Sequence, residues 1–263
     1  MEFSEEQYQA AIEKIRNGLA ELNSKIAQIP EACNAALASA NLPDAVRERV
    51  VWLVNKMVEI LQSVVRRIGE LMEGAAAPIF MFRYAYQWQD VRGLANGVAG
   101  NLRPEALKVN RYWRGAANDA YNRAVKPQSD AATKIGSIAE RTSTSLNVCA
   151  AAGLAFYMAL GVIVVKFIAA AVAVIAALGS VALSWAGLLL IVEEAGVNTG
   201  LIIAAVASLT ALLGAQASQI AVMHGESIDN SVFPSGRWPE STAGSFGDGS
   251  VLGGNAPWQL TNP

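Results

Sequence analysis

The sequence predicts an all-α protein in which a soluble helical half is followed by helices that cross a membrane. Two observations predict this. Charge is concentrated early in the chain: 18 of the 20 Lys and Arg residues lie at or before Arg141, and 16 of the 22 acidic residues lie at or before Glu140. Apolar residues in that part recur at the spacing of amphipathic helices, whereas residues 149–223 are almost free of charge.

Residues 1–77 are predicted to form a helical hairpin. Two segments carry apolar residues at alternating spacings of three and four, the pattern of a coiled-coil seam, and neither alternates as a half-buried strand does. Pro30 is expected to end the first helix, and Gly74 and Pro78 the second. The seam residues are Tyr8, Ile12, Ile15, Leu19, Leu22, Ile26 and Ile29, and then Val46, Val50, Leu53, Met57, Ile60, Val64, Ile68 and Leu71.

Residues 78–148 are predicted to form a second hairpin, with helices over 79–102 and 116–147. Glycines in the first helix lower its helix propensity but allow a partner helix to approach closely. The second helix keeps its apolar spacing up to the first uncharged run, so we expect it to continue into the membrane. The predicted apolar faces are Tyr84, Trp88, Val91, Leu94, Val98 and Leu102, and then Ala131, Ile135, Ile138, Thr142, Leu146 and Cys149.

Residues 149–224 are predicted to cross the membrane. Residues 149–192 carry one charge, Lys166, and residues 199–223 carry none. About 20 consecutive apolar residues are enough for one crossing, so there is material for at least two. Glu193 and Glu194 lie between the two runs, where a turn accommodates them better than a membrane centre does.

The sequence is compatible with either two or three membrane crossings. A two-span hairpin uses 167–192 and 199–223, with Lys166 at the interface, and leaves both ends on one side. A three-span arrangement breaks the first run at Gly179-Ser180, and Lys166 then snorkels or pairs with one of the two glutamates. Basic residues precede the first run and the turn is acidic, so the positive-inside rule places the N-terminal half in the cytoplasm. The sequence thus predicts a multi-pass protein of the cell membrane.

A tryptophan motif lies between the two helices of the second predicted hairpin. It reads Trp113-x-Gly115-x-Ala117-x-x-Ala120-Tyr121. This resembles the WXG100 superfamily, small helical hairpins associated with type VII (ESX) secretion in actinobacteria and Gram-positive bacteria. The resemblance covers residues 79–147, and it implies a turn and a partner-binding surface formed by Trp113, Gly115, Ala117 and Tyr121.

The motif also makes physical sense as a turn. Gly115 can adopt a backbone conformation forbidden to bulkier residues. Trp113 offers a large surface for burial beside the turn or in a partner's groove. Ala117 lets a second helix come close, and Tyr121 adds a packing group one turn later. A tryptophan in the core of any bundle turn would give the same pattern.

The chain departs from the WXG100 pattern in two ways. It adds an N-terminal hairpin and membrane spans to a family of soluble hairpins. The family's Tyr-x-x-x-Asp/Glu secretion signal normally follows the second helix, whereas here it occurs before the turn, from Tyr86 to Asp90. A membrane-resident relative, or a toxin-like effector that inserts into a target membrane, fits these departures better than an exported soluble substrate.

No catalytic or ligand-binding constellation stands out in the sequence, so we expect no enzyme activity, no cofactor and no metal site. The single histidine, His224, follows the last run, and Cys33 and Cys149 are too few for a disulfide framework. The net charge of −2, without a basic patch, argues against nucleic acid as a partner.

Residues 225–263 are predicted to be a disordered tail, because they are rich in glycine and proline. Phe233, Trp238 and Trp258 stand out in it. They either rest on the bundle or the membrane interface, or form a short peptide that docks to a partner.

Two function hypotheses follow. The first is a membrane-anchored, WXG100-like interaction protein associated with type VII secretion, whose hairpins form homo- or hetero-oligomers with a second copy or a helical partner. The second is a secreted effector or pore-forming protein that is stored soluble and later inserts into a lipid bilayer through residues 149–223. A structural membrane protein with a coincidental Trp-x-Gly is a third, weaker alternative.

Overall fold

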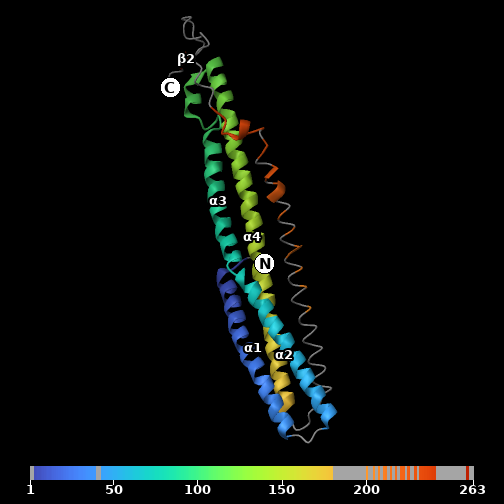
Figure 1. Ribbon diagram of the computed structural model, residues 1–263. Coiled ribbons are helices and arrows are strands. Elements are labelled where there is room, and N and C mark those ends of the chain that lie inside the picture. Colours follow the sequence, from blue (N-terminus) through green and yellow to red (C-terminus); the bar gives the residue numbers. More distant parts are fainter. Residues whose placement is uncertain are drawn as a thin grey trace. The chain divides into compact units, whose positions relative to one another are not determined.

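The computed structural model describes residues 3–39 and 43–179, part of the positions from 200 to 240, and residues 259–260. Its long elements are α1 (Glu5–Ser39), α2 (Asp44–Glu73), α3 (Ala77–Asn101) and α4 (Ala116–Gly179) (Figure 1). Shorter elements are η1 (Lys108–Arg111), η2 (Pro234–Gly236) and the two-residue strands β1 (Trp113–Arg114) and β2 (Gln259–Leu260). The all-α prediction is therefore confirmed.

The chain divides into two compact units. Unit 1 contains residues 1–81 and 148–214, and unit 2 contains residues 82–147 and 215–263. Both α3 and α4 contribute to both units, because the boundaries at residues 81/82 and 147/148 fall inside these helices.

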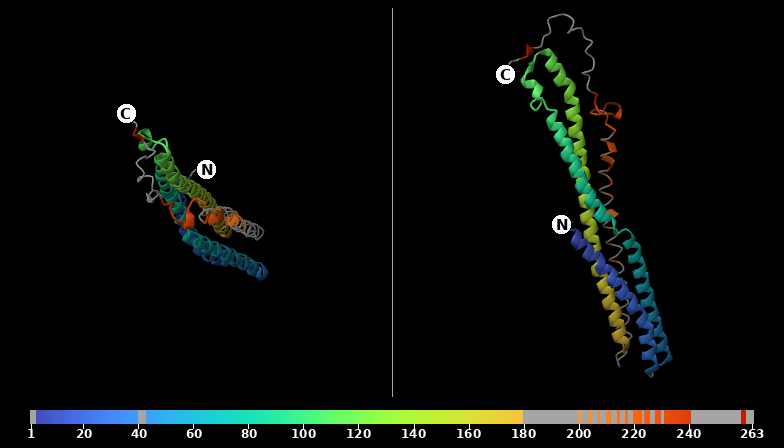
Figure 2. Two further views of the ribbon diagram at one scale, coloured as in Figure 1. Left: turned by 90° about the horizontal axis from the view of Figure 1, so that it is seen from above. Right: turned by 90° about the vertical axis from the view of Figure 1, so that its left-hand side faces the viewer.

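Unit 1 is built on a bundle of α1, α2 and the C-terminal part of α4 (Figure 2). Each helix buries one apolar stripe, and these stripes meet in a common core. The side chains of Ile15, Leu22 and Ile29 from α1, of Leu53, Leu61 and Ile68 from α2, and of Leu154, Leu160, Phe167 and Leu178 from α4 are almost fully buried. Apolar residues at helical spacing thus line α4 as well as the two helices of the predicted hairpin.

α1 lies close against α4 at Gly18. A Cβ placed on this residue would lie 2.5 Å from Cγ1 and 3.7 Å from Cβ of Val164. One turn away, a Cβ on Gly161 would lie 3.7 Å from the Ile15 side chain. Residue numbers rise together along both helices at these contacts, so α1 and this part of α4 run parallel. Glycine is required at Gly18 because any side chain there would displace the β-branched Val164.

Tyrosines hold the three helices together at one end of the bundle. The Tyr8 hydroxyl donates a hydrogen bond to the Ala75 carbonyl at 2.5 Å, and the Tyr157 hydroxyl donates one to the Leu71 carbonyl at 2.9 Å. The two rings meet edge to face, with centroids 5.6 Å apart. Because the last carbonyls of a helix have no partner within it, the two hydroxyls satisfy acceptors at and just beyond the C-terminus of α2.

The structure corrects the prediction that Pro30 ends the first helix. α1 continues through Pro30 to Ser39. Pro30 is exposed, whereas Ile29, Cys33 and Leu37 on the same helix are buried. A proline inside a helix removes one hydrogen bond and costs about 3 kcal/mol. Continued burial of the apolar stripe outweighs that cost.

Unit 2 contains a second helical hairpin, whose seam consists of small residues. Ala85 and Ala99 of α3 are buried, as are Ala132 and Ala139 of α4. Gly136 lies so close to α3 that a Cβ placed on it would be 2.5 Å from Oδ1 of Asn96. Small residues at these positions allow the two backbones to approach closely.

This seam corrects the prediction about which face of α3 packs in the hairpin. The large apolar residues predicted to line it lie on the outside: Tyr84 is 53% exposed, Leu94 is 74% exposed and Val98 is 45% exposed. In the predicted α4 stripe Ala131 is buried as expected, but from there on the buried positions lie one residue later, at Gly136, Ala139 and Ser143. The size of the apolar residues was a misleading guide because close helix contact selects small side chains.

A substitution at the Gly18 contact of unit 1 tests this packing. Gly18→Val should lower the free energy of unfolding by about 1–3 kcal/mol, because overpacking forces Val164 and α1 apart. Gly69→Val is the matched control, since a Cβ at this exposed position of α2 meets nothing within 4 Å. Urea denaturation followed by circular dichroism measures both variants. Equal stabilities would contradict the α1–α4 contact.

Candidate functional site

The first candidate site is the apolar stretch, which we define as residues 149–179 of α4. Among the described residues, α4 is the one helix that is long and apolar enough to cross a membrane. In its most apolar window of 18 residues, 39% is buried inside the protein. The stretch is therefore neither an ordinary buried core helix nor a fully exposed one.

The apolar stretch has an inner and an outer face. The inner face packs in the bundle core, where Val164, Phe167 and Ala171 are fully buried. The outer face is also apolar, although it is exposed: Met158 is 42%, Val162 54% and Val172 44% exposed. A soluble helix normally has a polar outer face, so this composition matches hydrocarbon better than water.

The predicted membrane charges are only partly described. Lys166 is exposed and lies within the apolar stretch. Glu193 and Glu194, with the turn predicted around them, lie outside the described residues. The second apolar run is described only at separate helical positions, so the choice between two and three crossings stays a prediction.

The second candidate site is the tryptophan turn, residues 113–121, in unit 2. It begins after α3 and continues into the first turns of α4, so Trp113 and Gly115 lie between the two helices as the sequence predicts. Gly115 has a φ of 105°, a region that side chains other than glycine's rarely adopt. Trp113 is half-buried, and its ring lies 5.8 Å from that of Tyr121. Ala117, also half-buried, lies at the start of α4.

The turn also accepts a strand from the tail. β1 pairs with β2 in antiparallel register, so that Trp113 is opposite Leu260 and Arg114 opposite Gln259. Earlier in the tail, Pro239 is buried, whereas Trp238 is 43% exposed. These described parts of the tail belong to unit 2. Trp258 lies outside the described residues.

Three asparagines fix the turn, and sequence reasoning did not single them out. The Asn118 amide donates to the Trp113 carbonyl, the Asn122 amide donates to the Asn118 side chain at 2.9 Å, and the Asn110 amide donates to the Asn122 side chain at 2.9 Å. The Asn110 amide also lies 2.7 Å from the Pro104 carbonyl. The i, i+4 spacing of Asn118 and Asn122 at a helix start was the available signal.

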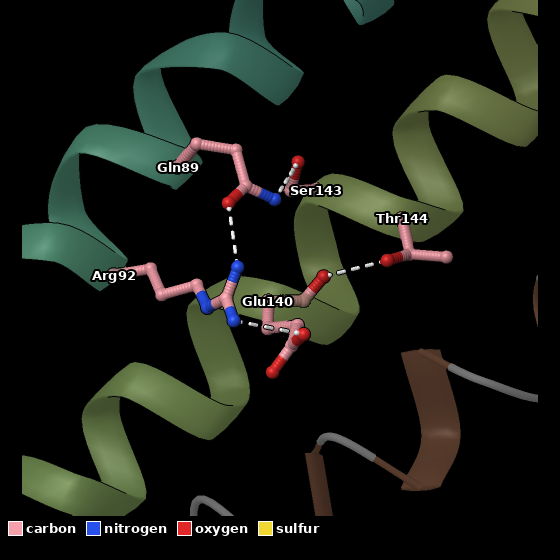
Figure 3. A network of polar contacts seen from close by, with 5 residues as sticks. All are labelled: Gln89, Arg92, Glu140, Ser143 and Thr144. Atoms are coloured by element: carbon pink, nitrogen blue, oxygen red, sulfur yellow. Dashed lines mark hydrogen bonds and ion pairs between the residues drawn. The ribbon is translucent and has the colours of Figure 1, made fainter. Parts of the chain in front are cut away.

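Polar side chains cross the helix seam of unit 2 (Figure 3). The buried Ser143 hydroxyl donates to the Ala85 carbonyl at 2.8 Å and accepts from the Gln89 amide at 2.9 Å. The Gln89 side-chain oxygen accepts from Arg92 at 3.2 Å, and Arg92 pairs with Glu140 at 3.2 Å. Figure 3 shows Gln89 and Arg92 reaching from α3 toward Glu140 and Ser143 on α4. The cluster therefore joins the two helices of the hairpin.

The described residues contain no group of three or more His, Cys, Asp and Glu side chains that could hold a metal ion. Cys33 is buried in α1 and Cys149 is half-buried, and both are free thiols. Burial raises the pKa of the Cys33 thiol above its ordinary value.

Comparison with known proteins adds no relative: no family model, no curated protein and no solved structure matches the chain.

A pair of neighbouring hydroxyl residues tests the polar seam. Ser143→Ala should destabilise unit 2 by roughly 1–3 kcal/mol, because it leaves the Gln89 amide without its acceptor in a part-buried site. Thr144→Ala is the control, since that exposed hydroxyl bonds to the Glu140 carbonyl within the same helix. Hydrogen exchange of the α3 amides, compared between the two variants, reports the difference. Equal exchange would count against the seam.

Proposed function

We propose that this protein inserts into membranes and carries its apolar helix in a water-soluble bundle until it meets a lipid bilayer. The observation that supports the proposal most is the packing of α1 along the apolar stretch, at the contacts of Gly18 with Val164 and of Ile15 with Gly161.

This packing is incompatible with a membrane-spanning α4. α1 carries charged, exposed side chains close to its contact with α4, namely Glu13, Lys14, Arg16 and Glu21. If α4 crossed a bilayer with α1 still packed along it, these charges would enter hydrocarbon at a cost of roughly 3 kcal/mol each. The α1–α2 hairpin must therefore leave the apolar stretch before the stretch can span a membrane.

The outer face of the apolar stretch favours the same conclusion. It presents Met158, Val162 and Val172 to the outside while the hairpin covers the opposite side. An apolar surface of this kind binds a lipid surface by the hydrophobic effect. When the stretch enters the bilayer, Lys166 can keep its charge near water by extending its ammonium group toward the lipid headgroups.

A disulfide lock tests the proposal. The Cβ positions of residues 18 and 164 lie 3.7 Å apart, and disulfides need about 3.5–4.5 Å. Gly18→Cys and Val164→Cys are introduced into a chain that also carries Cys33→Ala and Cys149→Ser. The oxidised chain should leave dye-loaded liposomes intact, because the hairpin cannot leave α4. Reduction should restore dye release.

The cysteine-free parent, measured with and without reductant, controls for effects of the reductant on the vesicles. Liposomes that stay intact with every chain would contradict membrane insertion. A locked chain that releases dye as fast as the reduced chain would contradict the need for the hairpin to open.

A second candidate function rests on unit 2. The exposed face of α3 carries Tyr84, Val91, Leu94 and Val98 at spacings of 7, 3 and 4, which is typical of a helix that binds another helix. With the tryptophan turn beside it, this face supports a membrane-anchored, WXG100-like interaction protein associated with type VII secretion. In that role the chain would be a multi-pass protein of the cell membrane, with its N-terminal half in the cytoplasm.

Cross-linking in native membranes tests this second function. Leu94→Ser should reduce recovery of a cross-linked second copy or helical partner at least fivefold, because burying a leucine contributes about 1.5–3 kcal/mol. Tyr86→Ser is the control, since Tyr86 is 62% exposed but lies outside the stripe. Equal recovery with wild type and both variants would exclude this face as the interface.

A further inference from the structure

The link between α3 and α4 forms one end of the helical hairpin in unit 2 (Figure 1). We name residues 103–123, which comprise this link and the first turns of α4, the basic cap. Its basic residues are Arg103, Lys108, Arg111, Arg114 and Arg123, and its acidic residues are Glu105 and Asp119. Because the whole chain has a net charge of −2, the rest of the chain is net negative and the cap is net positive.

The asparagines of the tryptophan turn gather bases that are separated in the sequence. The Asn110 amide donates to the Pro104 carbonyl at 2.7 Å and to the Asn122 side chain at 2.9 Å. The arginines next to these three residues in the chain are Arg103, Arg111 and Arg123. The expectation that the chain has no basic patch is therefore wrong for this end of unit 2, because hydrogen bonds collect bases that the sequence spreads out.

The charges of the cap face solvent. All five basic residues are exposed. Within the part of the chain that the structure describes, none of the five pairs with a carboxylate. The tail strand that reaches the cap adds no charge, since β2 consists of Gln259 and Leu260. Like charges held close together repel one another, so an anionic surface that covers the cap relieves this repulsion and attracts every base.

Exposed side chains between the bases favour a lipid surface as the anionic partner. Tyr112 is 49% exposed and Val109 is 38% exposed. Tyrosine is favoured at the level of lipid headgroups, where its ring and its hydroxyl meet different environments. A nucleic acid duplex carries phosphates along its whole length and favours an extended basic surface, whereas this cap is confined to the end of a hairpin.

We propose that the basic cap binds the surface of bilayers that contain anionic lipid. The end of a helical hairpin can touch a flat surface without interference from the sides of its helices. The inference goes beyond the proposed membrane insertion, because binding through the cap requires no movement of the apolar stretch. It also names the class of lipid that the protein prefers.

Vesicle sedimentation of the full chain tests the proposal. Vesicles of about one-third phosphatidylserine in phosphatidylcholine should bind the wild type at least tenfold more tightly than phosphatidylcholine alone. A chain with Arg103→Gln, Arg111→Gln and Arg123→Gln should lose most of this preference, since each base at an anionic surface contributes roughly fivefold in affinity. Full binding by this triple variant would overturn the proposal.

Two matched variants separate the position of the charges from their number. Arg→Lys at the same three cap positions keeps the charge and should bind as the wild type does. Arg47→Gln, Arg66→Gln and Arg67→Gln remove as much charge from exposed positions of α2 and should retain the preference. An equal loss in the α2 variant would mean that overall charge decides binding, and would refute the cap. Circular dichroism checks that all three variants keep the helicity of the wild type.

Salt provides an independent readout. Raising NaCl from about 0.1 M to about 1 M shortens the Debye length from about 10 Å to about 3 Å and should abolish the preference for anionic vesicles. A preference that survives high salt would contradict an electrostatic contact. A short RNA duplex that binds the wild type more tightly than anionic vesicles do, and loses binding in the glutamine cap variant, would assign the cap to nucleic acid instead.

Dye release from the same vesicles is read separately, because it reports insertion of the apolar stretch. If the cap variant loses binding to anionic vesicles while no chain releases dye, the cap stands and membrane insertion fails. If wild type and cap variant release dye equally, and neither prefers anionic vesicles, membrane insertion stands and the cap fails.

Discussion

The close contact of α1 with α4 at Gly18 is the constraint on which unit 1 depends. α4 carries an apolar stretch whose two faces both suit hydrocarbon, and α1 brings α2 with it to cover one of them. Two helix backbones can approach more closely where one of the facing residues has no side chain. Gly18 is such a residue, and the stripes on both sides of this position then bury Ile15, Leu22 and Phe167. A side chain at this position would push α1 away from Val164 and weaken the core that the hairpin shares with α4.

The helices within each of the two units pack together through different kinds of side chain. In unit 1 the helices meet mainly through large apolar residues, with glycines such as Gly18 at close contacts, so the stabilisation comes mainly from apolar burial. In unit 2 the seam is made of alanine, serine and glycine, and Ser129 and Ser143 donate hydrogen bonds across it to the Ala99 and Ala85 carbonyls. A small-residue seam buries little apolar area, so hydrogen bonds and close backbone contact matter more. The large apolar residues of α3 remain outside, where they are available to a partner.

Helix content, helix order and the place of the tryptophan turn were predictable from the sequence, because each rests on local patterns: apolar spacing, glycine and the loss of charge after Arg141. Two kinds of prediction were wrong: which positions of the helices face their partners, and where the first helix ends. Leu19 and Ile60 were assigned to the seams, but the buried neighbours are Gly18 and Leu61. A helical spacing of three or four leaves adjacent positions nearly equivalent, and only the partner helix decides between them. The continuation of α1 through Pro30 likewise depends on burial by residues distant in sequence.

The sequence also could not reveal that α1 and α2 of the same chain cover one face of the apolar stretch. This contact changes how the hydrophobicity of the stretch is interpreted. Length and lack of charge indicate that a helix is stable in hydrocarbon, but they are silent on what else can cover it. Here α1 and α2 offer a matched stripe on one side and charges such as Lys14 and Arg16 on the other. In the function that we propose, the same helix has two alternative environments, and the charges on α1 make them mutually exclusive. On this proposal the chain exchanges one environment for the other by moving the hairpin, so the free energy that holds α1 against α4 in water would also set the threshold for entering a membrane.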